Sequence, residues 1–164
     1  MLCLAHRLKD IDIGALWDLY RDALQNNAQE LYSNESRGYA LLLAEGDFYE
    51  YLRSSFFATE GAVYAFWKEN NRYLSGLRLE PYRDGLLIEA LETDPGHRRM
   101  GYGKLLMQAV LVQYAGNTIY SHIHKQNTAS LQLHFSCGFH RVSDQAVYID
   151  GSVNDRCYTL AWKD

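Results

Sequence analysis

Residues 98–106 read Arg-Arg-Met-Gly-Tyr-Gly-Lys-Leu-Leu and join a stretch with the pattern of a strand to one with the pattern of a helix. The strand pattern covers residues 86–93 and the helix pattern residues 104–114. The first amides of a helix have no partner within the helix and lie at the positive end of its dipole. Gly101 and Gly103 let the backbone approach a ligand closely. The stretch therefore predicts an anion-binding loop, most naturally for phosphate.

Three kinds of phosphate-binding loop can be compared with this stretch. A P-loop requires Lys and then Ser or Thr after its last glycine, but Tyr102 and Gly103 follow Gly101 here. A dinucleotide-binding loop requires a third glycine, and Leu106 stands in its place. The third pattern is Arg/Gln-x-x-Gly-x-Gly/Ala after a strand, and Arg98, Gly101 and Gly103 match it.

A second motif follows downstream, where residues 127–139 read Asn-Thr-Ala-Ser-Leu-Gln-Leu-His-Phe-Ser-Cys-Gly-Phe. It resembles the pattern Asn-x-x-Ala/Ser-x-x-Leu-Tyr/His-x-x-x-Gly-Phe. With the glycine loop before it, the chain resembles the GNAT superfamily of acyl-CoA N-acyltransferases. The second motif is most similar to that of the phosphinothricin-type branch, which also has a His at the position of His134.

The resemblance and the hydrophobic patterns together predict an α/β (α+β) fold in one domain, residues 1–164. Its central sheet is expected to be mixed and mostly antiparallel, with helices on both faces in the order β-α-α-β-β-β-α-β-α-β-β. The helices before the glycine loop are expected over residues 10–27 and 38–57. The last two strands are expected to form a hairpin from residues 141–149 and 156–162.

The resemblance implies that acetyl-CoA is the co-substrate. Its pyrophosphate is expected on the loop formed by Arg98, Arg99, Met100, Gly101, Tyr102, Gly103 and Lys104. Its pantetheine arm is expected to pair like an added strand with the main chain of Leu91, Glu92 and Thr93, because the corresponding strand of the family splays from the next strand. Asn127, Ser130 and His134 are expected beside that arm, although Asn127 also suits a helix N-cap and Ser130 suits close packing.

Acyl transfer to an amine requires a donor for the oxyanion, a base for the amine proton and, in some enzymes, an acid for the thiolate. In many family members a Tyr at the position of His134 is the acid. His134 is therefore a proton donor, a contact to CoA or substrate, or a residue that only packs. Glu89 is the leading base, because strand alternation predicts that it shares a face with Leu91 and Thr93 while Glu92 points the other way. Weaker candidates for the base are Glu80 and Tyr148.

The acceptor is expected to be a primary amine of a small molecule. In the family, the two helices before the central strands form a wall of the acceptor site, which makes Tyr32, Tyr39, Phe48 and Tyr49 candidates to contact it. His122 and His124 alternate along a strand, as the first two ligands of a zinc site can. No carboxylate or cysteine at a familiar spacing completes such a site, so no metal is predicted.

The bulk properties restrict the classes of partner. A net charge of −4 gives no footprint for nucleic acid, and no apolar run reaches the ~18 residues of a membrane span. Three scattered cysteines and the absence of a signal-peptide layout indicate a cytoplasmic enzyme, for which a homodimer is a further expectation. The alternatives are a protein N-terminal or lysine acetyltransferase, a CoA-binding sensor without catalysis and, third, a nucleotide-binding module.

Overall fold

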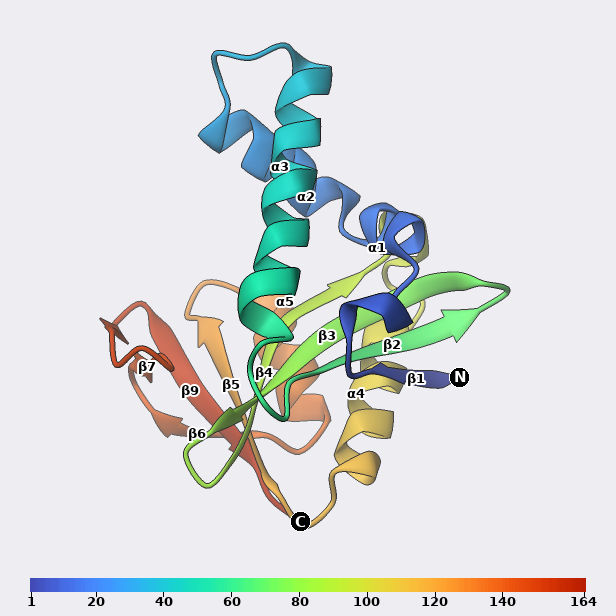
Figure 1. The fold of residues 1–164 in the computed structure, drawn as a ribbon. Coiled ribbons are helices and arrows are strands. Elements are labelled where there is room, and N and C mark those ends of the chain that lie inside the picture. Colours follow the sequence, from blue (N-terminus) through green and yellow to red (C-terminus); the bar gives the residue numbers. More distant parts are fainter.

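The computed structural model describes residues 1–164 and is built around one seven-stranded sheet (Figure 1). The strand order is β1-β2-β3-β4-β5-β9-β6, and every neighbouring pair is antiparallel except β4 and β5. The strands are β1 (Leu2–Ala5), β2 (Val63–Glu69), β3 (Arg72–Tyr82), β4 (Gly85–Thr93), β5 (Thr118–His124), β6 (His140–Ser143) and β9 (Cys157–Trp162). The predicted class, a mixed and mostly antiparallel sheet with helices on both faces, is confirmed.

Two hydrophobic cores lie on opposite faces of this sheet. The helices are α1 (Ile13–Leu19), α2 (Arg21–Leu31), α3 (Arg37–Tyr51), α4 (Tyr102–Gln113) and α5 (Thr128–Ser136). In β2, Val63 and Ala65 belong to the core beneath α4, while Tyr64 and Phe66 belong to the core beneath α1. This alternation is why both faces of the sheet are covered. No helix combines the length and the apolar character that a membrane crossing requires.

The first predicted helix is wrong in detail, because residues 10–27 form parts of two helices. Asp12 caps α1 by accepting the amide of Ala15, and the helix ends at Tyr20, whose backbone leaves the helical region. The chain then turns into α2, which continues to Leu31 and packs along α3. These two helices project from the body of the molecule (Figure 1). The exposed Gly46 does not interrupt α3.

The last predicted hairpin is confirmed only in its pairing. Strand β6 pairs with β9, but the strand predicted over residues 141–149 ends at Ser143. The chain then forms a separate small hairpin of β7 (Ala146–Val147) and β8 (Val153–Asn154) before it returns as β9. This small hairpin lies next to β9, which β7 contacts.

Strand β4 contains a bulge that changes which side chains share a face. Arg78 pairs with Glu89 and Gly76 with Glu92, so that both Ala90 and Leu91 lie opposite Leu77. Ala90 adopts a left-handed backbone with φ +50°. A bulge inserts one residue and reverses the alternation beyond it.

The predicted alternation in β4 is therefore wrong. Glu92 pairs with Gly76, whose added Cβ would meet Leu19 of α1, so Glu92 lies on the α1 face together with Glu89. Leu91 packs on the α4 core instead. The bulge thus places two carboxylates on the face toward α1 and turns Leu91 to the opposite face.

Candidate functional site

The loop at residues 98–104 has the geometry of an anion-binding site. Gly101 is the N-cap of α4 with φ +88°, and Arg99 is also left-handed with φ +64°. None of the amides of residues 98–104 donates to another group of the protein; Leu105 is the first to do so, to the carbonyl of Gly101 at 3.0 Å. Backbone amides freed in this way form a concave site for an anion at a helix N-terminus.

The two glycines of the loop have different functions. An added Cβ at Gly101 would meet no atom within 4 Å, so this glycine supplies the positive φ and leaves room for a ligand. Gly103 is buried, and an added Cβ would lie 3.2 Å from Thr93 Oγ1 and 3.4 Å from Leu133 Cδ1. Gly103 therefore allows α4 to pack closely against β4 and α5.

The side chain of Arg98 connects the loop to its surroundings. Its guanidinium lies 2.8 Å from a carboxylate oxygen of Asp22 on α2 and 3.2 Å from one of Glu92 on β4. Its charge is thus already paired, whereas the exposed Arg99 and Lys104 have no ion pair. Backbone amides, supplemented by these two cations, are the groups left to bind an anion.

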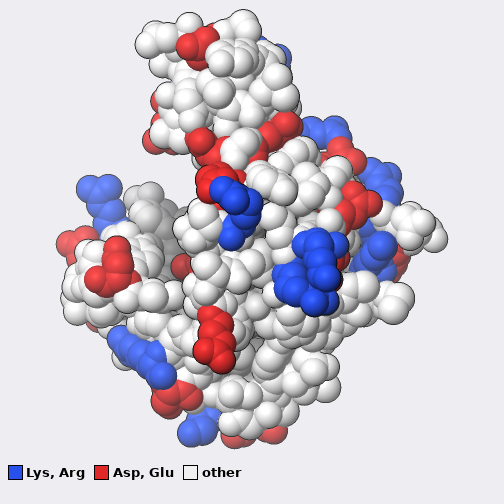
Figure 2. All heavy atoms as spheres, viewed as in Figure 1, with Lys and Arg blue, Asp and Glu red and all other residues white.

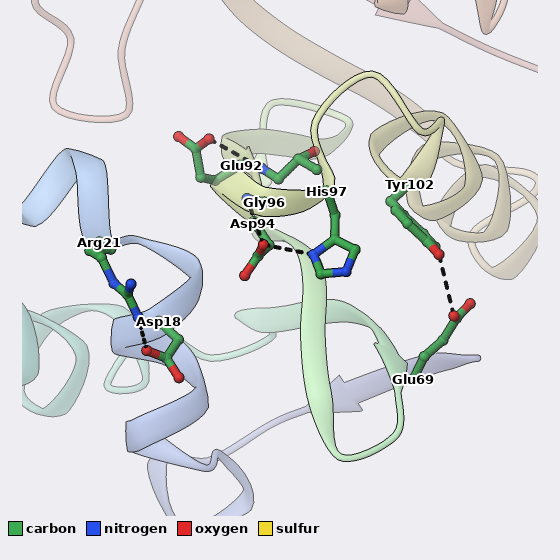
Figure 3. Close-up of polar contacts among 9 residues, drawn as sticks. Asp18, Arg21, Glu69, Glu92, Asp94, Gly96, His97 and Tyr102 are labelled. Atoms are coloured by element: carbon green, nitrogen blue, oxygen red, sulfur yellow. Dashed lines mark hydrogen bonds and ion pairs between the residues drawn. The ribbon is translucent and has the colours of Figure 1, made fainter.

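The turn before the loop is held by its own polar contacts (Figure 3). The buried carboxylate of Asp94 accepts the amide of Gly96 at 2.9 Å and lies 2.8 Å from Nδ1 of His97. The Tyr102 hydroxyl donates to Glu69 at 3.4 Å. These contacts fix the path of the chain from β4 into α4.

Beyond the loop, β4 and β5 separate and leave a slot. Their parallel pairing ends at Ile88 and Ser121, as expected for a splayed β4. A cavity of about 210 Å³ follows, and its lining residues are Ile88, Glu89, Ala90, Leu91, Ser121, His122, Ile123, His124, Asn127, Ser130 and His134. Of the predicted pantetheine contacts, Leu91, Asn127, Ser130 and His134 lie here. Glu92 and Thr93 do not, and the Thr93 amide donates to the Glu92 carboxylate at 3.2 Å.

A larger cavity of about 410 Å³ lies between α2, α3 and β4. Its lining residues are Tyr20, Ala23, Leu24, Asn27, Leu31, Ala44, Asp47, Phe48, Arg78, Ala90, Leu91 and Glu92. Ala90 and Leu91 line both this cavity and the slot, so the two spaces meet at the bulge of β4. The Tyr20 hydroxyl donates to the Ala90 carbonyl at 2.6 Å and fixes the bulge from the side of α1.

Residues 14–139 match the sequence profile of the Acetyltransferase (GNAT) family. The chain belongs to the GNAT acetyltransferase family. It is therefore an acyl-CoA-dependent N-acetyltransferase, which transfers an acyl group to an acceptor. A comparison with curated proteins gave no significant match.

Solved structures of other N-acetyltransferases share this fold. An N-acetyltransferase from Staphylococcus aureus Mu50 has a TM-score of 0.67 and 13% identity over 98% of this chain and 100% of its own. The PaiA N-acetyltransferase of Thermoplasma acidophilum, solved with coenzyme A, has a TM-score of 0.62 and 12% identity over 100% and 99%. The ribosomal-protein-S18-alanine N-acetyltransferase of Escherichia coli has a TM-score of 0.55 and 15% identity over 98% and 92%.

In this GNAT domain, His134 is oriented by the helix that carries it. The side chain is buried, and Nδ1 lies 2.8 Å from the Ser130 carbonyl, which can only accept a hydrogen bond. Nδ1 therefore carries the proton, and in the neutral ring Nε2 is an acceptor; Nε2 has no partner within the protein. Burial lowers the pKa of His134, and the hydrogen bond to Ser130 offsets only part of this shift. The ring is therefore neutral at neutral pH. In this state His134 accepts a hydrogen bond at Nε2.

His122 lines the slot from the other face of the GNAT sheet. Its ring lies 5.4 Å from that of Tyr82 and 5.3 Å from that of Tyr148, measured between centroids, and both ring nitrogens are buried without a partner. Burial, with a smaller contribution from Arg83, lowers the pKa of His122 to about 4. Two neutral imidazoles, those of His122 and His134, thus line the slot.

Two carboxyls lie next to each other on the α1 face. Glu89 lies 3.8 Å from a guanidinium nitrogen of Arg78, which is itself packed over the ring of Tyr51 at 4.9 Å. Glu80 is buried, and burial together with the charge of Glu89 raises the pKa of Glu80. The neighbouring carboxyls form a unit that can take up a proton beside the slot.

The acceptor-side residues differ from those expected. Phe48 alone of the four predicted aromatics lines the larger cavity; Tyr32 donates its hydroxyl to Asp47, and Tyr39 and Tyr49 are exposed. Tyr20, Arg78 and Asp47 are among the lining residues of this cavity that were not predicted from the sequence. Their positions depend on how the helices pack on β3 and β4, and no local spacing signals them.

Proposed function

We propose that this enzyme transfers the acetyl group of acetyl-CoA to the primary amine of a small molecule. One observation carries the proposal: a slot bordered by α5, the helix that packs at Gly103 of the anion-binding loop, meets a second cavity at the bulge of β4. A donor bound in the slot and an acceptor bound in the second cavity would place their reacting groups at Ala90 and Leu91. Holding both reactants in this way supplies much of the rate enhancement of a two-substrate reaction.

Several groups of the chain suit the donor. The free amides of residues 98–104 would bind the pyrophosphate, and the slot beside Leu91 would receive the pantetheine arm. The Nε2 of His134 would accept a hydrogen bond from an amide N–H of that arm, and this makes it a binding contact instead of a proton donor. The Thermoplasma structure with coenzyme A supports the choice of donor, since it shares this fold.

The reaction would proceed at the bulge. The amine nitrogen attacks the thioester carbonyl carbon, and a β4 amide donates to the oxygen as it becomes negative. Leu91 is the proposed donor of this hydrogen bond, because the Thr93 amide is already used by Glu92. Glu89 takes the proton of the amine, directly or through water, and the carbon–sulfur bond breaks to release the CoA thiolate. That thiolate is protonated from solvent, since His134 is neutral.

The size of the acceptor cavity favours a small molecule. Its volume of about 410 Å³ falls within the usual range of small-molecule sites, and apolar side chains with a few polar groups line it. The three cysteines are free thiols, which supports a location in the reducing cytoplasm.

Two measurements test the proposal together. Acetyl-CoA should raise the melting temperature, and a panel of primary amines should release CoA in a thiol assay. Gly101→Asp serves as a control, because it places a carboxylate in the anion-binding loop and should remove the shift. No shift with the unaltered protein would contradict the donor site. A shift without turnover of any small amine would favour a CoA sensor or a protein acceptor.

A further inference from the structure

The charges that line the acceptor cavity do not balance. Three charged side chains line it, and two of them are paired: Arg78 with Glu89 at 3.8 Å and Glu92 with Arg98 at 3.2 Å. The third is Asp47 on α3, which has no ion pair and accepts only the hydroxyl of Tyr32. The cavity therefore retains one carboxylate that no cation of the protein neutralises.

The wall next to Asp47 is apolar. Leu24 and Leu31 of α2 line it, as does Phe48 of α3. The Phe48 ring is held against the ring of Tyr20, with centroids 5.5 Å apart, and so is ordered. Asp47 on α3 and the bulge on β4 thus border one cavity whose walls suit a hydrocarbon chain.

The helices above the cavity are strongly acidic. Residues 12–50 hold eight of the 20 acidic side chains of the protein and only two of its 16 Lys and Arg. Figure 2 shows acidic side chains where the projecting helices join the body. Two carboxylates, Asp47 and Glu92, line the cavity against one cation, Arg78, and an excess of one sign of charge raises the local concentration of ligands of the opposite sign.

We propose that the acceptor carries a second cationic group, separated from the reacting amine by a short hydrocarbon chain. The reacting amine lies at Ala90 and Leu91, the chain packs on Leu24 and Phe48, and the second cation pairs with Asp47. This inference rests on the proposed function and specifies its substrate class. An acceptor with a carboxylate in place of the second cation would be repelled by the same side chain.

The test uses three acceptors of equal chain length: an α,ω-diamine, the alkylamine and the ω-amino acid. We expect kcat/KM for the diamine to exceed that for the alkylamine by about threefold to fivefold, as for one ion pair with the exposed carboxylate of Asp47, and the amino acid to be poorest. Asp47→Asn should lower kcat/KM for the diamine to the value for the alkylamine, so that the preference disappears, and leave the KM for acetyl-CoA unchanged. Glu45→Gln, which removes a charge from the same helix outside this cavity, should keep the preference.

The possible outcomes separate this inference from the proposed function. Equal kcat/KM values for the diamine and the alkylamine, or a preference that survives Asp47→Asn, would overturn the inference while acetyl transfer stands. If acetyl-CoA binds but none of the three amines is acetylated at any chain length tested, the proposed function fails and the inference fails with it.

Discussion

Replacing Tyr20 by Phe tests whether the bulge of β4 is part of the catalytic machinery. The Tyr20 hydroxyl donates to the carbonyl of Ala90 at 2.6 Å, next to the proposed oxyanion donor Leu91. The ring itself is buried and packs against Phe48 and Tyr64, and a Phe ring would keep these contacts. The substitution therefore removes one hydrogen bond and little else.

The magnitude follows from that single bond. A hydrogen bond between neutral groups contributes roughly 1 kcal/mol net, and leaving the partly buried carbonyl without a partner adds to the loss, so the free energy of unfolding should fall by about 1–2 kcal/mol. Removing an oxyanion donor outright lowers kcat by about 10²–10³-fold. A displaced donor should cost less, and we expect kcat to fall by about tenfold with the KM for acetyl-CoA nearly unchanged.

The assay combines urea unfolding with steady-state kinetics, and Tyr73→Phe is its matched control. The Tyr73 hydroxyl accepts the amide of Asp12 at 3.1 Å, away from the bulge. Tyr73→Phe should therefore lower stability by a similar amount and leave kcat unchanged. A normal kcat in Tyr20→Phe, or an equal loss of kcat in both variants, would refute a catalytic function of the bulge.

Three further predictions concern other parts of the site. Gly101→Ala should cost about 1 kcal/mol of unfolding free energy through left-handed strain alone, whereas Gly103→Val should cost more than about 2 kcal/mol because it must displace Thr93 and Leu133. Equal losses of stability in urea titrations would contradict the different functions assigned to these two glycines. Glu89→Gln should lower kcat/KM by about 10²-fold at neutral pH, and the deficit should shrink as the pH approaches the pKa of the amine; a deficit independent of pH would argue against a base. His122 should lower stability in acid, because with its pKa of about 4 only the unfolded chain takes up the proton between pH ~6.5 and about 4. His122→Gln should recover about 2 kcal/mol of the unfolding free energy in acid, after allowance for solvent screening, and unchanged acid unfolding would count against the burial of His122 as a neutral ring.

The parts of the fold that the sequence predicted well depend on local signals. The glycine loop, α5 with its Asn127 cap and the strand over Thr118–His124 each have their pattern within a few residues. The hairpin of β2 and β3 also has a local signal, its polar turn, in which Asn70 and Asn71 adopt positive φ. In these places the local preference and the final structure agree.

The bulge of β4 could not be predicted in the same way. Its left-handed residue is Ala90, and alanine carries no preference for positive φ that a reader of the sequence could detect. The conformation is stabilised from outside the strand, by Tyr20 at the C-cap of α1. Strand alternation therefore placed Glu89 and Glu92 on opposite faces, although they share one. The same dependence on tertiary packing conceals Asp47, which reaches the cavity only because α3 packs along α2.

The most direct test of the account is a structure of the protein with acetyl-CoA. We predict the pyrophosphate on the amides of residues 98–104, the pantetheine arm between β4 and β5, and the thioester oxygen within about 3 Å of the Leu91 amide nitrogen. An amide N–H of the pantetheine arm should lie within hydrogen-bond distance of the Nε2 atom of His134. A thioester placed away from Ala90 and Leu91, or a donor bound outside the slot, would contradict the claim that donor and acceptor meet at the bulge.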